Sequence, residues 1–295
     1  MQEASRVQDM QARLAHTGYI AERSLAATLV LFTQMQRPLL LEGEAGVGKT
    51  DIARVLARMF DCPLIRLQCY EGLDVNAAVY EWNYQHQLLA IKLLEHGKIN
   101  PENAEHHIFS EKYLLQRPLL QAISQPASPV LLIDEIDRAD EEFEAYLLEV
   151  LSDFQVSVPE LGTIKAISQP YVVLTSNGTR ELSDALRRRC LYYYVEYPEF
   201  DKELRIVNAR LPDIGPKLAR QVVAFVQALR KTDLRKSPGI AETLDWAAAL
   251  MQLDVSRLDG DIEAVMDSLI CLLKTREDSA GLARVEVERL VAQAV

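Results

Sequence analysis

The chain has 295 residues, of which 49% are hydrophobic, and a formal net charge of −11. A full core is therefore available, and disorder is not expected. No apolar run approaches the roughly 18 to 20 residues of a membrane span. The first residues form no signal sequence, and four scattered cysteines form no C-x-x-C pair, which together predict a cytoplasmic protein with reduced thiols. The acidic balance disfavours nucleic acid as the main partner, because binding phosphate backbones requires clustered Lys and Arg.

The first part of the chain predicts two helices followed by a strand. Residues 5–36 divide into two helical stretches near Gly18, and the second is rich in Ala and Leu. Pro38 ends that helix, because proline cannot continue it. The apolar run Leu39–Leu41 then predicts a buried strand.

The next stretch, Gly43–Thr50 (GEAGVGKT), fills all four fixed positions of the G-x-x-x-x-G-K-[ST] pattern. Apolar residues at helical spacing follow it, so the context is a strand, a glycine-rich loop and a helix. Glycines let the backbone N–H groups turn into one concavity, and the helix N-terminus behind them adds partial positive charge. Lys49 supplies a full charge for the outer phosphates, and the Thr50 hydroxyl can bind Mg²⁺. The pattern predicts a nucleoside triphosphate site.

The segment between the two main motifs is less informative. It predicts a short strand at residues 64–68, an irregular stretch at 69–84, and helices at 85–96 and 113–123. Three histidines, His96, His106 and His107, lie close together in the sequence. No carboxylate or cysteine at ligand spacing accompanies them, so exposed loop histidines are the favoured interpretation over a metal site.

The second main motif begins with the continuous apolar run Val130–Ile133, which predicts a central strand of a parallel sheet. It ends in Asp134 and Glu135. An acidic pair at the carboxyl end of such a strand faces the crevice in which open α/β sheets bind ligands. Asp134 suits Mg²⁺ coordination, and Glu135 is placed to take a proton from the water that attacks the γ-phosphate. A helix-capping pair is the alternative, and the upstream phosphate loop makes it the weaker one.

Beyond the acidic pair, the sequence predicts an amphipathic helix at 141–154, two short strands at 155–158 and 163–167, and a buried strand at 171–175. Asn177 follows that strand and could orient the attacking water, although Asn-Gly also makes an ordinary turn. A helix then ends in Arg187, Arg188 and Arg189. These arginines are either a solvated face or candidates to reach a neighbouring subunit's γ-phosphate.

After a fifth strand at 190–197, the pattern becomes helical, with stretches at 217–231, 240–253 and 261–274. We therefore predict two domains. Residues 1–198 form an α/β nucleotide-binding domain with a parallel five-stranded sheet and helices on both faces. Residues 199–295 form a small all-α lid.

Taken in order, these motifs resemble an AAA+ ATPase, and within that family the MoxR branch. The resemblance runs from about Gly18 to Trp246. GEAGVGKT resembles Walker A, VLLIDEIDRAD Walker B, LLEVLSDFQVSVPELGTI the helix-and-hairpin insertion, and VVLTSN sensor 1. The stretches LQCYEGLDVNAAVYEWNYQ and SPGIAETLDW are most similar to CoxD-type proteins, which accompany carbon monoxide dehydrogenase.

The resemblance implies roles by position. It implies that Gly18–Ile20 lines the adenine pocket and that Arg189, or else Arg188, is the arginine finger. One position departs from the family: MoxR proteins often have an arginine where this chain has Gly239, and Arg235 or Lys236 could substitute. We assign nucleotide binding to Tyr19, Ile20, Gly43, Glu44, Ala45, Gly46, Val47, Gly48, Lys49, Thr50 and Asp51, Mg²⁺ binding to Thr50 and Asp134, and catalysis to Glu135, Asn177, Arg189 and Arg188.

The resemblance also implies a ring, usually a hexamer, with ATP at subunit interfaces. It implies a partner protein with a von Willebrand A-type domain and a chaperone role in metalloenzyme maturation. The main hypothesis is an ATP-hydrolysing chaperone that remodels a client protein. An activase of another metabolic enzyme, a nucleic-acid-remodelling AAA+ ATPase and a scaffold that binds nucleotide but barely hydrolyses it are the alternatives. The acidic charge disfavours the nucleic-acid alternative, and the intact acidic pair disfavours the scaffold.

Overall fold

The computed structural model describes residues 2–95 and 108–295, and these form two compact units. The first unit comprises residues 1–10, 23–42 and 50–194, and the second comprises residues 11–22, 43–49 and 195–295. The division at residue 198 that we predict from the sequence stays a prediction. Each unit is described by itself below.

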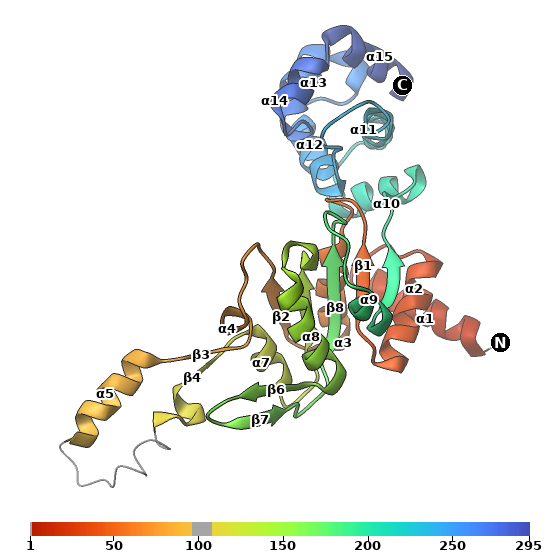
Figure 1. Cartoon of the computed structure of the whole chain (residues 1–295). Coiled ribbons are helices and arrows are strands. Elements are labelled where there is room, and N and C mark those ends of the chain that lie inside the picture. The colour runs from red at the N-terminus through yellow and green to blue at the C-terminus, as the bar shows by residue number, and fades with distance from the viewer. Residues whose placement is uncertain (1, 96–107) are drawn as a thin grey trace. The chain divides into compact units, whose positions relative to one another are not determined.

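The first unit is built on a parallel five-stranded sheet with strand order β2-β5-β8-β1-β9. Every residue of the central β5 is buried, as its unbroken apolar run predicts. Because all strands run the same way, their carboxyl ends meet at one edge of the sheet (Figure 1). The strands are β1 (Leu39–Glu42), β2 (Leu64–Gln68), β5 (Val130–Asp134), β8 (Tyr171–Ser176) and β9 (Leu191–Tyr194).

Helices flank this sheet, and the predicted fold class is confirmed. Besides the sheet, the first unit holds the antiparallel strand pair β3–β4 and the hairpin β6–β7, which lie toward the amino ends of the sheet strands (Figure 1). The principal helices are α1 (Gln2–His16), which continues into the second unit, α2 (Arg23–Met35), α3 (Lys49–Phe60), α5 (Tyr84–Glu95), α7 (Pro118–Ile123), α8 (Glu141–Asp153) and α9 (Asp184–Arg189). The strands of these two pairs are β3 (Tyr80–Trp82), β4 (Leu114–Gln116), β6 (Gln155–Val158) and β7 (Gly162–Lys165).

Two expectations about the middle of the chain are wrong. The stretch predicted to be irregular contains the short helix α4 (Val75–Ala78) and strand β3. The helix predicted at 113–123 is instead a 3-10 turn, strand β4 and the shorter α7. Arg117 has extended backbone angles because the residue before a proline avoids the helical region. Pro118 therefore begins a helix rather than lying inside one.

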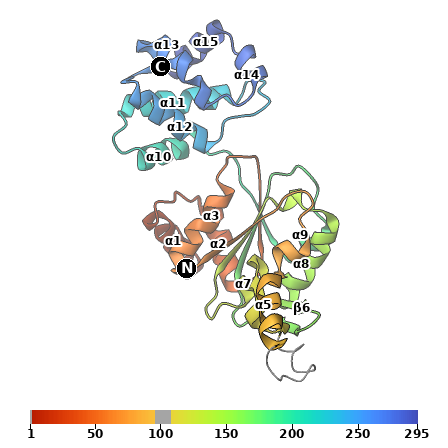
Figure 2. The same ribbon diagram turned by 90° about the vertical axis from the view of Figure 1, so that its left-hand side faces the viewer.

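The second unit contains a helical bundle from residue 200 onward. In Figure 2, α11 and α12 lie between α10 and the group formed by α13, α14 and α15. Trp246 is fully buried, packs against Phe225 at 4.8 Å between ring centres, and donates from its indole N–H to Ser268 Oγ at 2.8 Å. The helices are α10 (Phe200–Arg210), α11 (Pro216–Leu229), α12 (Ile240–Gln252), α13 (Ile262–Ser268), α14 (Arg276–Gly281) and α15 (Arg284–Ala294), with 3-10 turns at Leu258–Gly260 and Leu269–Cys271.

Among the residues that the structure describes, no helix combines the length and apolar character needed to cross a bilayer.

Candidate active site

The glycine-rich loop lies between β1 and α3, as the sequence predicts. Gly46 and Gly48 have φ angles of 82° and 93°, a region that side-chain-bearing residues rarely adopt. At Gly43, an added Cβ would lie 2.2 Å from the carbonyl oxygen of Val195, so the backbone approach itself requires glycine there. The shape of the loop therefore depends on all three of its glycines, two fixed by the pattern and Gly46 in addition.

Lys49 brings an ammonium group back over this loop. Its Nζ donates to the carbonyl oxygens of Gly43 and Glu44, both at 2.7 Å, and the residue is buried. A lysine that spans its own loop supplies positive charge where the phosphates of a nucleotide are expected.

Thr50 joins the glycine-rich loop to the acidic pair. Its Oγ1 donates to Asp134 Oδ1 at 3.1 Å, and Thr175 Oγ1 donates to the same oxygen at 2.5 Å. The Asp134 side chain is only 4% exposed. The fold thus brings together two predicted Mg²⁺ ligands that are far apart in the sequence.

These oxygens fit Mg²⁺. The ion prefers oxygen ligands and is usually held by one or two protein groups together with substrate phosphates and water. Thr50 and Asp134 offer such a pair, and no group of three or more His, Cys, Asp or Glu that could hold a metal occurs in the described parts of the chain. The donor set therefore suits an ion shared with a nucleotide rather than an all-protein cage.

Arg66 is a site residue that the sequence did not reveal. From β2 its Nε and Nη2 donate to Asp134 Oδ2 at 3.0 and 2.5 Å, and it also donates to Gln68. β2 and β5 pair in register, with Gln68 opposite Asp134, and this register brings the arginine beside the carboxylate. A buried carboxylate without a positive partner is costly, and Arg66 provides that partner for Asp134.

Glu135 adopts an uncommon backbone conformation. Its φ is 56°, in the left-handed region, and its N–H donates to Thr175 Oγ1 at 2.9 Å. Its carboxylate is 34% exposed and accepts from Arg138 Nη1 at 3.1 Å. Non-glycine residues held at positive φ cluster at functional sites. The backbone thus directs the two adjacent carboxylates to different partners, one buried and one reachable by water.

Asp137 fixes the loop that carries Asn177. Both of its carboxylate oxygens accept from the Asn177 N–H at 3.2 Å, and Oδ2 accepts from the Thr179 N–H and hydroxyl at 3.0 and 2.6 Å. Burial alone would raise the pKa of Asp137, but these hydrogen bonds outweigh it and lower the pKa. Their stabilisation is present above the ordinary pKa and is lost as pH falls through the lowered one. Asp137 is thus, after Arg66, a second site residue that the sequence motifs did not reveal.

Cys69 lies beside the acidic pair and stays a thiol. Its N–H donates to the Asp134 carbonyl at 2.8 Å. Burial, with the nearby negative charge of Asp134, raises the pKa of Cys69 to about 12. A protonated thiol is a poor nucleophile, so we assign no catalytic role to Cys69.

The three consecutive arginines point to different partners. Arg187 Nη2 lies 3.3 Å from Glu42 Oε2, and Arg189 Nε donates to Ser152 Oγ at 2.7 Å. The Arg188 side chain is 83% exposed and lies 4.0 Å from Asp184. Both Arg188 and Arg189 are exposed, so either could extend to a neighbouring subunit.

The remaining predicted residues stay predictions as nucleotide contacts. Tyr19 follows α1 and donates its N–H to the Leu14 carbonyl at 3.0 Å. Asp51 lies in the first turn of α3, 3.7 Å from Arg54. The three histidines of the discarded metal interpretation fall at residues 96–107, outside the described residues.

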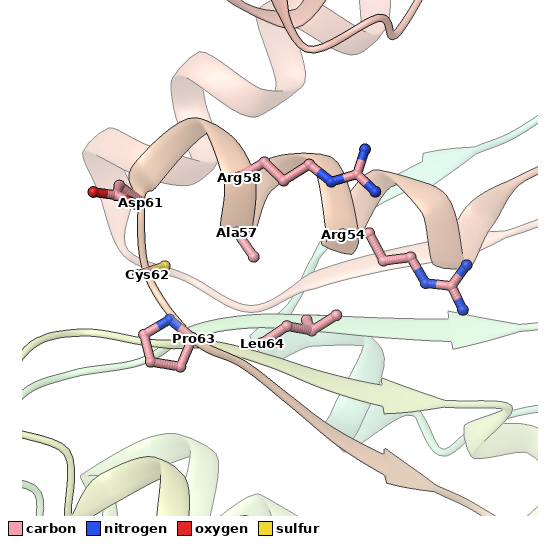
Figure 3. Close-up of a pocket in the computed structure, with 7 residues that line it drawn as sticks. All are labelled: Arg54, Ala57, Arg58, Asp61, Cys62, Pro63 and Leu64. Carbon is pink, nitrogen blue, oxygen red and sulfur yellow. The ribbon is translucent and has the colours of Figure 1, made fainter. Parts of the chain in front are cut away.

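One pocket of the first unit lies away from the acidic pair. It has a volume of about 580 Å³ and lies where the end of α3 turns into the start of β2. Figure 3 shows Arg54 and Arg58 projecting from the helix above Leu64. Its lining contains none of the residues assigned from the sequence, and Leu64 is at the opposite end of β2 from Gln68. It is therefore separate from the candidate active site.

Residues 38–190 match the family described as AAA domain (dynein-related subfamily). The chain belongs to this AAA family. An uncharacterized protein of Staphylococcus aureus strain USA300 is 26% identical over 230 residues, covering 74% of this chain and 77% of that protein, and one from the bovine strain RF122 matches to the same extent. The Holliday junction branch migration motor RuvB of Thermotoga maritima is similar in structure, with 17% identity, 89% of this chain and 68% of that chain covered, and a TM-score of 0.44.

Membership of the AAA family accounts for the geometry around Thr50 and Asp134. AAA+ domains hydrolyse nucleoside triphosphates, generally ATP with Mg²⁺, and typically assemble as rings. The matched residues begin just before β1 and end just after α9, so they include the glycine-rich loop, the acidic pair and Asn177. The family match therefore supports nucleoside triphosphate hydrolysis by the segment that carries these residues.

Proposed function

We propose that this AAA protein is a MoxR-type ATPase, most similar to CoxD-type proteins, which uses ATP hydrolysis to remodel a client protein. The observation that carries the ATPase assignment is the Thr50–Asp134 hydrogen bond, because it joins the end of the phosphate loop to the acidic pair. The client role is supported by the MoxR-like sequence of α8 and the β6–β7 hairpin. A metalloenzyme such as carbon monoxide dehydrogenase is the proposed client, and an activase of another metabolic enzyme is the alternative.

Each residue of the site has a distinct proposed task. Lys49 and the loop N–H groups bind the outer phosphates. Thr50 and Asp134 would hold Mg²⁺, which supplies charge neutralisation at the phosphates when bound. Glu135 accepts a proton from water as the water oxygen bonds to the γ-phosphorus and the bond to ADP breaks. Asn177 orients that water, and an arginine from the next subunit neutralises the developing charge.

We further propose a homo-oligomeric ring, a hexamer, located in the cytoplasm and working with a von Willebrand A-type partner. The support is the MoxR-like sequence, since typical AAA+ proteins act as rings. Proteins that co-purify from the native source would identify the client and show whether that partner accompanies it.

Replacing Lys49 with alanine tests the nucleotide site. Removing one charge-assisted contact to phosphate should weaken Mg·ATP binding by roughly ten- to a hundredfold. Titration calorimetry with a non-hydrolysable ATP analogue measures this, and Lys165→Ala, at an exposed position of β7, is the matched control. Unchanged affinity in the Lys49 variant would contradict the phosphate-loop assignment.

Nucleic acid should bind this protein weakly. The net charge of −11 opposes the counterion release that drives association with phosphate backbones. We expect no saturable binding of duplex or single-stranded DNA at low micromolar concentration and physiological salt, and no change in hydrolysis rate when DNA is added. Anisotropy and phosphate-release assays measure both. Saturable binding with DNA-stimulated hydrolysis would instead favour the nucleic-acid-remodelling alternative.

A further inference from the structure

Two consecutive carbonyl groups of the glycine-rich loop are tied to residues of the helical part of the second unit. The Tyr197 hydroxyl donates to the Ala45 carbonyl at 3.3 Å, and the Ile240 N–H donates to the Gly46 carbonyl at 3.0 Å. In a trans peptide the C=O and N–H point in opposite directions. Holding these carbonyls outward therefore directs the N–H groups of Gly46 and Val47 the other way, and consecutive N–H groups on one side form an anion-binding concavity.

The contact at Gly46 requires glycine at position 239. An added Cβ on Gly239 would lie 2.6 Å from Gly46 Cα and 2.7 Å from the Gly46 carbonyl oxygen. Gly239 has a φ of −84°, which any residue adopts, so contact with the loop and not backbone freedom excludes a side chain. The Glu242 carboxylate closes the other side, accepting from the Gly239 N–H at 3.0 Å.

A buried ion pair holds this glycine in place. Arg230 donates to both carboxylate oxygens of Glu203 at 2.7 Å, and Glu203 is fully buried. The same arginine donates from Nε to the Pro238 carbonyl at 2.8 Å, and Thr243 Oγ1 donates to the Gly239 carbonyl at 3.0 Å. A bidentate pair with satisfied neighbours fixes geometry more firmly than a single bond does.

The ion pair also supports the second contact to the loop. The Arg230 guanidinium lies 4.6 Å from the centre of the Tyr197 ring, within cation–π range. Arg230 therefore contacts both Tyr197 and Pro238, the residue before Gly239. Tyr197 and Ile240 bond adjacent carbonyls of the loop. The two contacts belong to one rigid cluster.

We propose that Gly239 and Tyr197 are positioning residues that hold the phosphate loop in its anion-binding shape. This inference rests on the proposed ATP site. MoxR-type proteins often place an arginine at position 239, whose charge can act on phosphate directly. In this chain the same position acts on the phosphate loop through main-chain contact. Arg230 acts indirectly, because it bonds the Pro238 carbonyl and so holds the segment around Gly239 in place. Restoring the arginine, as Gly239→Arg, should therefore weaken nucleotide binding rather than strengthen it.

The test compares two glycines that both cap helices of the second unit. Gly239 caps α12 and Gly215 caps α11, and an added Cβ at Gly215 meets nothing within 4 Å. Kd for a fluorescent non-hydrolysable ATP analogue with Mg²⁺ should rise roughly ten- to a hundredfold in Gly239→Ala, the cost of overpacking a tight contact. Gly215→Ala should change Kd by less than about twofold.

A second variant keeps the test decisive if Gly239→Ala does not fold. Tyr197→Phe deletes one hydroxyl and keeps the ring beside Arg230, and Kd should rise about two- to tenfold. In the double variant the increase should be smaller than the product of the two single increases, because both substitutions disturb the same loop.

The outcomes separate this inference from the function on which it rests. If the wild type and Lys49→Ala bind the analogue equally poorly, the proposed ATP site is wrong, and the inference is wrong with it. If the wild type binds tightly and both Gly239→Ala and Tyr197→Phe match it, only the inference is overturned. Tighter binding by Gly239→Arg would also overturn it, because the position would then act through charge.

Discussion

Replacing Glu135 with glutamine should leave Mg·ATP bound and lower its hydrolysis rate by roughly a hundred- to ten-thousandfold, the usual contribution of a positioned general base. The amide keeps the size of the side chain and loses the ability to accept a proton. The structure makes the two roles separable, because Glu135 faces Arg138 and solvent while Asp134 bonds Thr50, Thr175 and Arg66. The residues that bind Mg·ATP should therefore keep their positions in the Glu135→Gln variant.

The measurement is single-turnover phosphate release alongside the affinity for ATP. Glu141→Gln is the matched control, because Glu141 is exposed in the first turn of α8 and is not one of the residues assigned to the site. If the variant loses both ATP affinity and hydrolysis, Glu135 contributes to nucleotide binding rather than to activation of the attacking water. Full turnover would place the base at another residue.

The sequence predicts the sheet and its functional edge because the signals there are local. An unbroken apolar run such as that of β5 predicts a strand buried on both faces, and the carboxyl ends of parallel strands meet at one edge of the sheet. Asp134 and Thr50 follow from that rule, although 84 positions separate them. The sequence therefore predicts that both residues belong to one site, whereas the hydrogen bond between them is a finding of the structure.

The residues that escape prediction act through register or loop shape. Arg66 reaches Asp134 only because β2 and β5 pair with Gln68 opposite Asp134, and an arginine on a short strand otherwise reads as a solvated side chain. Asp137 accepts hydrogen bonds from the N–H groups of Asn177 and Thr179, in the loop that follows β8. In the sequence, Gly239 is recognisable only as a departure from a family pattern. The structure shows that glycine is required there because the Gly46 backbone lies against it, and no local sequence pattern encodes that contact.

Removing the arginine that acts between subunits should lower hydrolysis by roughly a thousandfold or more while each subunit still binds ATP, as for other arginines supplied in trans. The resemblance favours Arg189 and then Arg188. Arg189 contacts Ser152 and the Ala185 carbonyl of its own chain, and Arg188 is 83% exposed. Surface contacts of this kind are weak, so neither arginine is prevented from reaching a neighbour. We expect alanine at one of them to be inactive and Arg205→Ala, exposed on α10, to be normal.

Mixing inactive subunits decides whether that arginine acts in trans. Subunits carrying Arg189→Ala or Arg188→Ala are combined with Lys49→Ala subunits, and assembly of mixed rings is verified by subunit-exchange fluorescence. Activity should return for the variant that lacks the finger, because an intact arginine from the Lys49→Ala subunit then faces an intact phosphate loop. No recovery in verified mixed rings would mean that the arginine acts within its own subunit. Full activity of both single variants would exclude Arg188 and Arg189 as the arginine finger.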